Sequence, residues 1–184
     1  MPACARCGNK GLFIKADETG ICLACRKKEY LDSFLTENNF TVDKQIENGY
    51  LSFIVDDKNK QWAISTDPEN SVRAYRLFSY SDLLNFEVFE DGDTIIKGNA
   101  GKAIVGGLLF GGIGALAGAA AKKKVKNVCT SLQVRIMVNS LNDNVIVIPL
   151  LYSETKKDGF IYKSHLAIAQ MLASTFTYIQ HNAA

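Results

Sequence analysis

The sequence predicts an α+β fold that is mainly β, with a small N-terminal module, a run of antiparallel strands and a closing C-terminal helix. Short segments rich in aromatic and β-branched residues, bounded by turn residues, run through residues 50–151 and predict the strands. One amphipathic segment follows them, and two close pairs of cysteines precede them. With 184 residues, 47% of them hydrophobic, the chain is long enough to bury one core beside a small appendage.

The strongest motif is a repeated Cys-x-x-Cys sequence, which pairs Cys4 with Cys7 and Cys22 with Cys25. A two-residue gap lets both thiolates of a pair bind one metal, and two pairs complete the tetrahedron that Zn²⁺ prefers. Because four thiolates leave no open coordination position, the zinc would be structural and would stabilise a module too small to fold by its core alone. The sequence therefore predicts a zinc ribbon over residues 1–32, with catalytic or redox cysteines as the alternative.

The N-terminal decapeptide MPACARCGNK lacks the apolar run of a secretory signal. We therefore expect a cytoplasmic protein with reduced cysteines, which disfavours disulfides. The fifth cysteine, Cys129, lies near a predicted strand with no nearby base, and we expect it to be a small buried apolar residue.

Basic residues accompany the four paired cysteines, and nearby acidic residues partly offset them. Two interpretations remain open, a nucleic-acid-binding surface and a solvated face around a small metal site. The basic residues are Arg6, Lys10, Lys15, Arg26, Lys27 and Lys28.

The segment RKKEYLDSFL, residues 26–35, is predicted to be helical, and residues 33–39 are assigned as the connector between the two domains. Beyond it, turn residues join the predicted strands into hairpins. The strands are expected at residues 50–55, 61–65, 72–79, 84–90, 94–98, 131–138 and 144–151. The Asp91-Gly92 pair, between the fourth and fifth of them, is the strongest short hairpin signal in the chain.

Residues 162–181 close the chain as one predicted helix, which we expect to cover the open end of a small barrel or bent sandwich. Its apolar residues recur at helical spacing and predict the face that packs on the strands. They are Leu166, Ile168, Met171, Leu172, Thr175, Phe176 and Ile179.

The strand order, the segment FSYSDLLNFEVFEDG and the closing helix resemble the bacterial pleckstrin-homology-like domains. With CARCG and GICLAC ahead of it and a glycine-rich insert after DGDTIIKG, the whole chain is similar to a family of uncharacterised proteins in Gram-positive bacteria and their phages. The resemblance implies zinc at the four paired cysteines and a pleckstrin-homology-like domain over residues 40–184. It also implies a binding or scaffolding module rather than an enzyme.

The residue pattern gives no separate support for catalysis. His165 and His181 lie sixteen residues apart on the predicted helix, so they cannot share a site within it. The segment GNAGKA lacks the spacing and the Ser or Thr of a phosphate-binding loop. Carboxylates gather around the Asp91-Gly92 turn, at Glu87, Glu90 and Asp93, and we interpret them as solvated surface. We therefore expect no enzyme and no small-molecule substrate.

Residues 103–121 carry no charge, and six of these nineteen residues are glycine. As a helix the run would span about 28 Å, close to the thickness of a bilayer core. On that helix four glycines form one stripe, the spacing that lets another backbone approach closely. The stripe consists of Gly107, Gly111, Gly114 and Gly118, and the basic residues Lys122, Lys123 and Lys124 follow the run.

Three interpretations of this insert, residues 100–126, remain open. It forms membrane-associated or re-entrant helices, it pairs with a copy in another subunit, or it is a poorly ordered loop. A single membrane crossing is disfavoured because strands of one sheet are predicted on both sides of the run. The lysines fit the attraction of basic residues to the anionic inner face of the membrane.

We therefore expect a zinc-binding adaptor or scaffold that associates with the membrane or self-assembles through the insert. Its partner would be another protein or a second copy in a homo-oligomer. One alternative is a nucleic-acid-binding regulatory protein that uses the zinc ribbon and the lysine cluster. The other is a phage-encoded protein that binds and inhibits a host factor.

Overall fold

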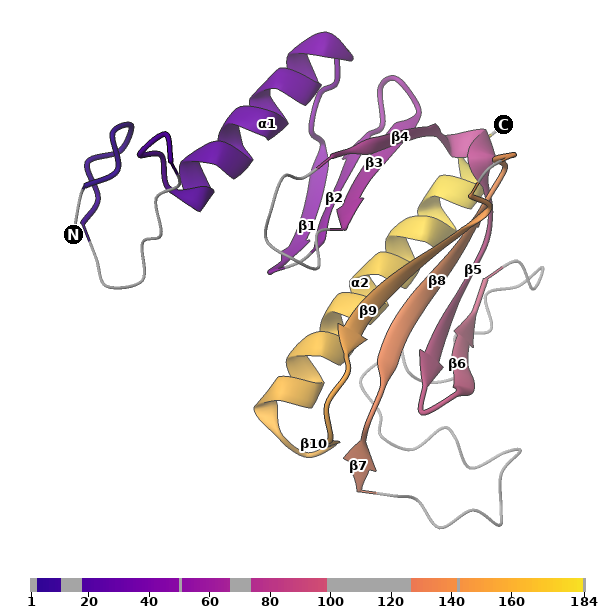
Figure 1. The fold of residues 1–184 in the computed structure, drawn as a ribbon. Coiled ribbons are helices and arrows are strands. Elements are labelled where there is room, and N and C mark those ends of the chain that lie inside the picture. Colours follow the sequence, from indigo (N-terminus) through magenta and orange to yellow (C-terminus); the bar gives the residue numbers. More distant parts are fainter. Residues whose placement is uncertain are drawn as a thin grey trace, which may run out of the picture. The chain divides into compact units, whose positions relative to one another are not determined.

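The computed structural model describes residues 3–10, 18–49, 51–66, 74–98, 127–141 and 143–183. The chain forms two compact units, Met1–Phe78 and Ser79–Ala184. The fold is mainly β with antiparallel pairing, a C-terminal helix and an N-terminal cysteine cluster, as the sequence predicts (Figure 1). The described strands form separate hydrogen-bonded sheets, and no ladder among them closes a barrel.

The first unit contains one long helix and a four-stranded sheet of order β1-β2-β3-β4. The elements are α1 (Leu23–Glu37), β1 (Lys44–Asn48), β2 (Leu51–Asp56), β3 (Gln61–Thr66) and β4 (Arg76–Ser79). Strand β1 was not predicted, because its sequence KQIEN buries only Ile46. The strand forms because it pairs with β2 along five residue pairs, and this pairing outweighs the weak strand propensity of its own sequence.

Helix α1 packs on one face of this sheet through its C-terminal half. Its side chains Leu31, Phe34 and Leu35 contact a buried cluster formed by Phe40, Ile54 and Ala63. The ring of Phe34 also stacks on Tyr75, with centroids 4.9 Å apart. None of the helix residues is fully buried, so a single apolar face holds α1 in place. The predicted connector is therefore part of a longer helix with a packing role.

The opposite face of the sheet carries a second buried group of side chains. Trp62 is fully buried, and its ring stacks on Phe78 with centroids 4.4 Å apart. Phe53 contacts the same indole at a centroid distance of 5.8 Å. Side chains alternate between the two faces of a strand, so Trp62 and its neighbour Ala63 lie on opposite faces of the sheet. Both side chains are buried, and β3 is therefore covered on both sides.

The loop between β2 and β3 is built around the buried carboxylate of Asp56. This carboxylate accepts hydrogen bonds from the backbone N–H of Thr41 and from both the backbone and side-chain amides of Asn59. Burial alone would raise the pKa of Asp56, but these donors lower it below its ordinary value. The carboxylate of Asp56 therefore stabilises the β2–β3 turn through Asn59 and connects it to the segment before β1 through Thr41.

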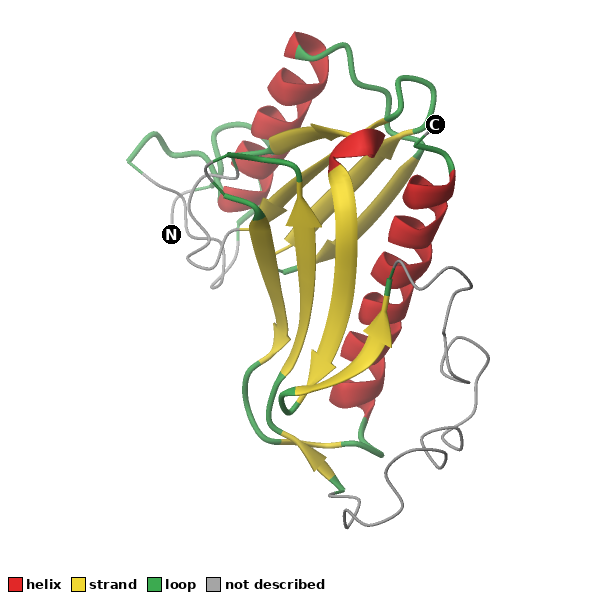
Figure 2. Cartoon of the chain, turned by 90° about the vertical axis from the view of Figure 1, so that its right-hand side faces the viewer, coloured by secondary structure: helices red, strands yellow, loops and turns green. Residues whose placement is uncertain are grey.

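The described residues of the second unit form a four-stranded sheet of order β6-β5-β8-β9, a short β10-β7 ladder and one long helix. The helix contacts β5, β8 and β9, and Figure 2 shows it running along the sheet. The elements are η1 (Tyr80–Asp82), β5 (Leu83–Glu90), β6 (Asp93–Lys97), β7 (Val128–Cys129), β8 (Leu132–Val138), β9 (Val145–Leu151), β10 (Thr155–Lys156) and α2 (Phe160–His181).

The buried face of α2 differs in part from the predicted one. Leu172, Thr175, Phe176 and Ile179 are buried as expected, but Met171 is 46% exposed. The helix instead places small residues, among them Ala169 and Ala173, against the sheet. The prediction counted only the larger side chains, whereas the buried face also contains small residues that allow the helix to pack closely on the sheet.

Glu90 is buried at the end of β5, which corrects its interpretation as solvated surface. Its carboxylate forms an ion pair with Lys157 and accepts a hydrogen bond from the hydroxyl of Tyr162. Burial, and then the hydrogen bond to this carboxylate, raise the pKa of Tyr162 above its ordinary value. These contacts tie β5 to the first turn of α2 over more than sixty residues of sequence.

Replacing Glu90 with glutamine should lower the free energy of unfolding by about 2 kcal/mol, because it leaves the partly buried Lys157 without its counter-charge. Urea unfolding followed by circular dichroism measures this loss. Glu87→Gln is the matched control on the same strand, since its ion pair with Lys97 is solvent-exposed on the lysine side and should contribute less than about 1 kcal/mol. Equal losses in the two variants would contradict the role of Glu90.

Candidate metal centre

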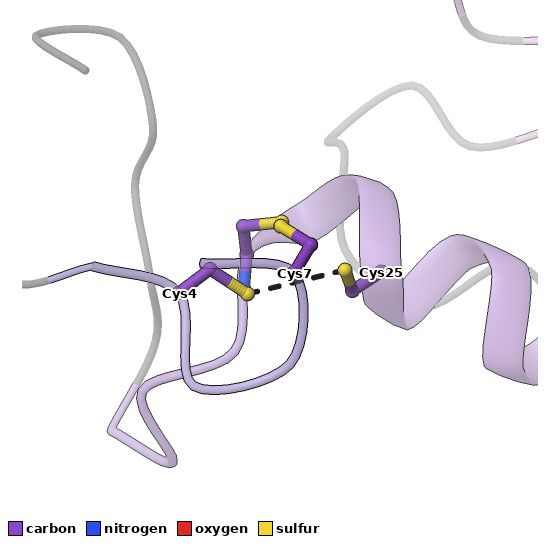
Figure 3. Close-up of side chains that lie close together, drawn as sticks. Cys4, Cys7 and Cys25 are labelled. Atoms are coloured by element: carbon purple, nitrogen blue, oxygen red, sulfur yellow. Dashed lines mark hydrogen bonds between the residues drawn. The ribbon is translucent and has the colours of Figure 1, made fainter. Parts of the chain in front are cut away.

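The four cysteines of the two Cys-x-x-Cys motifs converge at the N-terminal end of α1. The Sγ atoms of Cys4 and Cys25 lie 3.9 Å apart, those of Cys7 and Cys22 lie 3.8 Å apart, and all four lie within 4.8 Å of one another. Figure 3 shows the side chains of Cys4, Cys7 and Cys25 directed toward one another. The spacing of the motifs therefore brings together the residues that it predicts.

Two glycines in left-handed backbone conformations shape the turns around the cluster. Gly8 has a φ of +70° and directly follows the first motif, while Gly20 has a φ of +76° and comes shortly before the second. The N–H of Gly8 donates to the carbonyl of Cys4, and the carbonyl of Gly20 accepts from the N–H of Ala5. Since side chains disfavour these φ values, glycine at both positions lets the two segments fold back on each other.

The second pair of cysteines lies at the start of α1, which begins at Leu23, three residues before the predicted helical segment. Cys22 is the N-cap residue of α1 and has no side-chain capping hydrogen bond, and Cys25 lies in the first turn. The first turn also lacks an acidic residue, so the common signals for a helix start are absent.

Electrostatic effects at the cluster differ between the thiols. The backbone N–H of Cys22 donates to Sγ of Cys4 at 3.3 Å and, with other backbone donors, lowers the pKa of that thiol from 9.0 to about 6. The side chains of Cys7 and Cys22 raise the pKa of Cys25 to about 12. The backbone donors therefore favour the thiolate of Cys4, whereas the neighbouring sulfurs disfavour the thiolate of Cys25.

The geometry of the sulfur atoms fits a single tetrahedral metal ion. A tetrahedron with metal–sulfur bonds of about 2.3 Å has sulfur–sulfur edges of roughly 3.8 Å. The two distances of 3.8 and 3.9 Å match that value. They are also much longer than a disulfide bond of about 2.05 Å. By donor set and spacing the cluster could hold one metal ion, and four sulfur donors suit a thiophilic ion.

The surroundings of the cluster are mixed in charge and half-exposed. Cys4 and Cys22 are buried, whereas Cys7 is exposed. Arg6 forms an ion pair with Glu29 at 2.6 Å, so part of the basic character of this module is offset internally. The fifth cysteine, Cys129, is fully buried in the second unit as expected, and burial raises the pKa of its thiol to about 11.

The remaining predicted site residues belong to the glycine-rich insert and lie outside the described residues. They are Gly107, Gly111, Gly114, Gly118, Lys122, Lys123 and Lys124. Within the described part of the chain, no helix is long and apolar enough to cross a membrane.

The two histidines are engaged by the backbone of their own helix. His165 Nδ1 lies 2.7 Å from the carbonyl oxygen of Ile161, and His181 Nδ1 lies 2.7 Å from that of Thr177. Each contact reaches four residues back along α2, so the rings lie in separate turns at the two ends of the helix.

Residues 37–152 match the model of the protein family described as "Glycine zipper containing PH domain". The matched range runs from the last residue of α1 to the residue after β9, and it includes the whole glycine-rich insert. No curated protein and no solved structure matches the chain significantly. Because the match covers more than half of the chain, the protein belongs to the family of glycine-zipper-containing pleckstrin-homology domains.

Proposed function

We propose that this protein is a non-enzymatic, zinc-stabilised adaptor that is attached to the membrane, or to copies of itself, through its glycine-rich insert. The convergence of four sulfurs beside a helix that packs on the sheet is the observation that carries this proposal. In this organisation residues 1–32 form the zinc module and residues 33–39 the connector. Residues 40–184 form the pleckstrin-homology-like domain, interrupted by the insert at residues 100–126.

Zn²⁺ is the ion that fits the cluster best, because it prefers tetrahedral thiolate sites. Cys4, Cys7, Cys22 and Cys25 would fill all four positions, so the ion would be structural. It would fix the beginning of α1 at the cluster, while Leu31, Phe34 and Leu35 fix the other half on the sheet. An isolated helix of 15 residues is marginal in water, so both attachments matter for its stability.

The residues that flank the insert are held by β5 and by the turn directly after it, which supports an insert that leaves the unit and returns. At one end the N–H of Gly98 donates to the carbonyl of Phe86, and a Cβ at this glycine would lie 2.6 Å from the Phe86 ring. At the other end Asp91 accepts hydrogen bonds from Thr130 and Ser131. Phe86 and Asp91 are five residues apart, about 17 Å along an extended chain.

This placement disfavours a single membrane crossing, because such a crossing would leave the two ends on opposite sides of the bilayer. A hairpin that enters the lipid and returns is compatible with it, and so is pairing with the same segment of a second subunit. In either case the stripe of Gly107, Gly111, Gly114 and Gly118 would be the surface of close helix approach.

Deleting residues 103–124 should therefore change where the protein is found or how it assembles. We expect the full-length protein in the membrane fraction of cells, or in solution as an oligomer, and the deletion variant as a soluble monomer. Cell fractionation and light-scattering mass measurement distinguish these states. The proposal fails if both proteins are soluble and have the same mass.

Substitutions within the insert sharpen this test. Gly111→Leu combined with Gly114→Leu fills the stripe and should reproduce the effect of the deletion, because it blocks close approach of a second helix. Ala115→Leu, which lies off the stripe, is the matched control and should behave as the unaltered protein. If the control has the same effect as the glycine variants, the stripe is not the packing surface.

A further inference from the structure

Strand β9 is an outer strand of the sheet in the second unit, beside β8 (Figure 1). Among the described strands, only β8 pairs with it. The segment from Asn144 to Tyr152, which includes all of β9, contains no charged residue. The other outer strands of the two four-stranded sheets, β1, β4 and β6, each contain at least one. Charged residues on edge strands discourage pairing between molecules, so β9 is the edge that lacks this electrostatic protection.

The pairing with β8 determines which backbone groups of β9 point outward. The N–H of Val138 donates to the carbonyl of Asn144, so every second residue from Asn144 onward directs its backbone groups toward β8. Val145, Val147 and Pro149 alternate with those residues, and their backbone groups therefore point away from β8. Proline fits such a position because it has no N–H to donate. The outward edge thus offers the N–H groups of Val145 and Val147 and the carbonyls of all three residues.

This edge is complementary to a second copy of itself. In an antiparallel pair with a twofold axis at Val147, this residue exchanges both of its backbone hydrogen bonds with its copy. The N–H of each Val145 then donates to the carbonyl of Pro149 in the other chain, and the proline removes only the reverse bond. The side chains of Val145 and Val147 are 45% and 44% exposed, and this register brings both into cross-strand contacts. No like charges face each other across the axis, because the strand has none.

The size of this contact decides when it can form. Strand β9 has seven residues, whereas a stable interface involves about 20–30 residues on each side. The strand pair alone is therefore too small to hold two chains together in dilute solution. A separate attachment that brings two copies close together raises their effective concentration to about the millimolar range, where such a small contact forms.

We infer that two copies of this protein pair through β9 once the glycine-rich insert has brought them together, so that their sheets join into one continuous sheet. The inference rests on the proposed function, because either pairing of the inserts or their attachment to one membrane would concentrate the copies. It adds a contact between described residues that lies outside the insert. The occupant of the β9 edge is thus the same strand of a second copy.

Oxidative cross-linking of single added cysteines tests this register on the full-length protein. Val147→Cys places each new thiol opposite its copy, with Cα atoms about 5.5 Å apart, which is within the range of a disulfide. Val145→Cys is the matched control, because Val145 is almost equally exposed but lies about 13 Å along the strands from its copy. We expect Val147→Cys to form a covalent dimer roughly tenfold faster than Val145→Cys. The unaltered chain, with its own five cysteines, gives the background.

Hydrogen exchange of the unaltered chain checks the same contact without a substitution. The N–H groups of Val145 and Val147 point away from β8, so they should exchange rapidly in a single chain and be protected in the paired state. Deleting residues 103–124 should remove this protection, because the copies are no longer held together. The N–H of Val138, which donates within the sheet, should stay protected in both proteins.

These measurements separate the inference from the proposed function. If the deletion lowers the solution mass or releases the protein from the membrane, but Val147→Cys cross-links no faster than Val145→Cys, then β9 pairing is wrong and the role of the insert stands. If Val147→Cys cross-links faster with and without the insert, then β9 pairing stands and the role of the insert in assembly is wrong. Faster cross-linking of Val145→Cys, or no covalent dimer of either variant above background, overturns the inference, because the edge then has another register or another occupant.

Discussion

Replacing Cys4 and Cys7 with serine should reduce bound zinc from one ion per chain to none and should unfold the segment around the cluster. The apparent binding free energy of structural zinc sites is roughly 10–16 kcal/mol, which is larger than the contribution of the hydrogen bonds and the ion pair described around the cluster. We expect the start of α1, where the N–H of Arg26 donates to the carbonyl of Cys22, to lose protection from hydrogen exchange. Inductively coupled plasma mass spectrometry measures the zinc.

The packing of α1 limits how far this unfolding spreads. Phe34 and Leu35 lie on Ile54 and Ala63, so the second half of the helix and the sheet should stay protected in the cysteine variant. Cys129→Ser is the control, because this cysteine is buried in the other unit and should leave zinc content unchanged. Loss of protection across β2 and β3 would mean that the metal supports the whole first unit rather than its N-terminal segment.

Trp62→Ala should lower the free energy of unfolding of the first unit by about 3–5 kcal/mol. The indole is fully buried between the rings of Phe53 and Phe78, so its removal loses apolar burial and two aromatic contacts and leaves a cavity. Urea unfolding followed by circular dichroism measures the change. The tryptophan fluorescence of the unaltered protein reports on the same unit, because the chain has one tryptophan.

Two further variants calibrate the tryptophan result. Trp62→Phe keeps an aromatic ring in the stack and should lose less than half as much stability as Trp62→Ala. Leu141→Ala removes a fully exposed side chain in the other unit and should change stability by less than about 0.5 kcal/mol. A loss below about 1 kcal/mol for Trp62→Ala would show that the two aromatic contacts do not stabilise the first unit.

Short sequence motifs predict those structural features that depend on only a few neighbouring residues. The hairpin at Asp91-Gly92 formed as expected, with φ values of +51° and +88° at the two turn residues. A two-residue hairpin turn of this kind requires both residues in the left-handed region, which Asp and Gly tolerate. The convergence of Cys4, Cys7, Cys22 and Cys25 likewise follows from the two-residue spacing within each pair.

Features that depend on distant parts of the chain were not predictable in the same way. The local sequence predicts that Glu90 belongs to a solvated turn, but Lys157 and Tyr162, more than sixty residues away, hold it in a buried site. Strand β1 forms because β2 offers a pairing edge, although its own sequence contains one buried apolar residue, Ile46. In both cases the observed structure depends on contacts with residues distant in sequence, which local propensity does not predict.

The cysteine cluster also combines a feature that the local sequence predicts with one that depends on distant residues. Spacing alone predicts the four cysteines that come together, but it does not predict that Cys22 caps a helix whose far half packs on the sheet. That continuity gives the proposed zinc ion its structural role, since α1 connects the cluster directly to Phe40, Ile54 and Ala63.

X-ray absorption at the zinc edge, on full-length protein purified under reducing conditions, tests the central claim most directly. The proposed site predicts one zinc ion per chain with four sulfur neighbours at about 2.3 Å. A chain that binds no metal, or a zinc ion with oxygen or nitrogen among its four ligands, would contradict it.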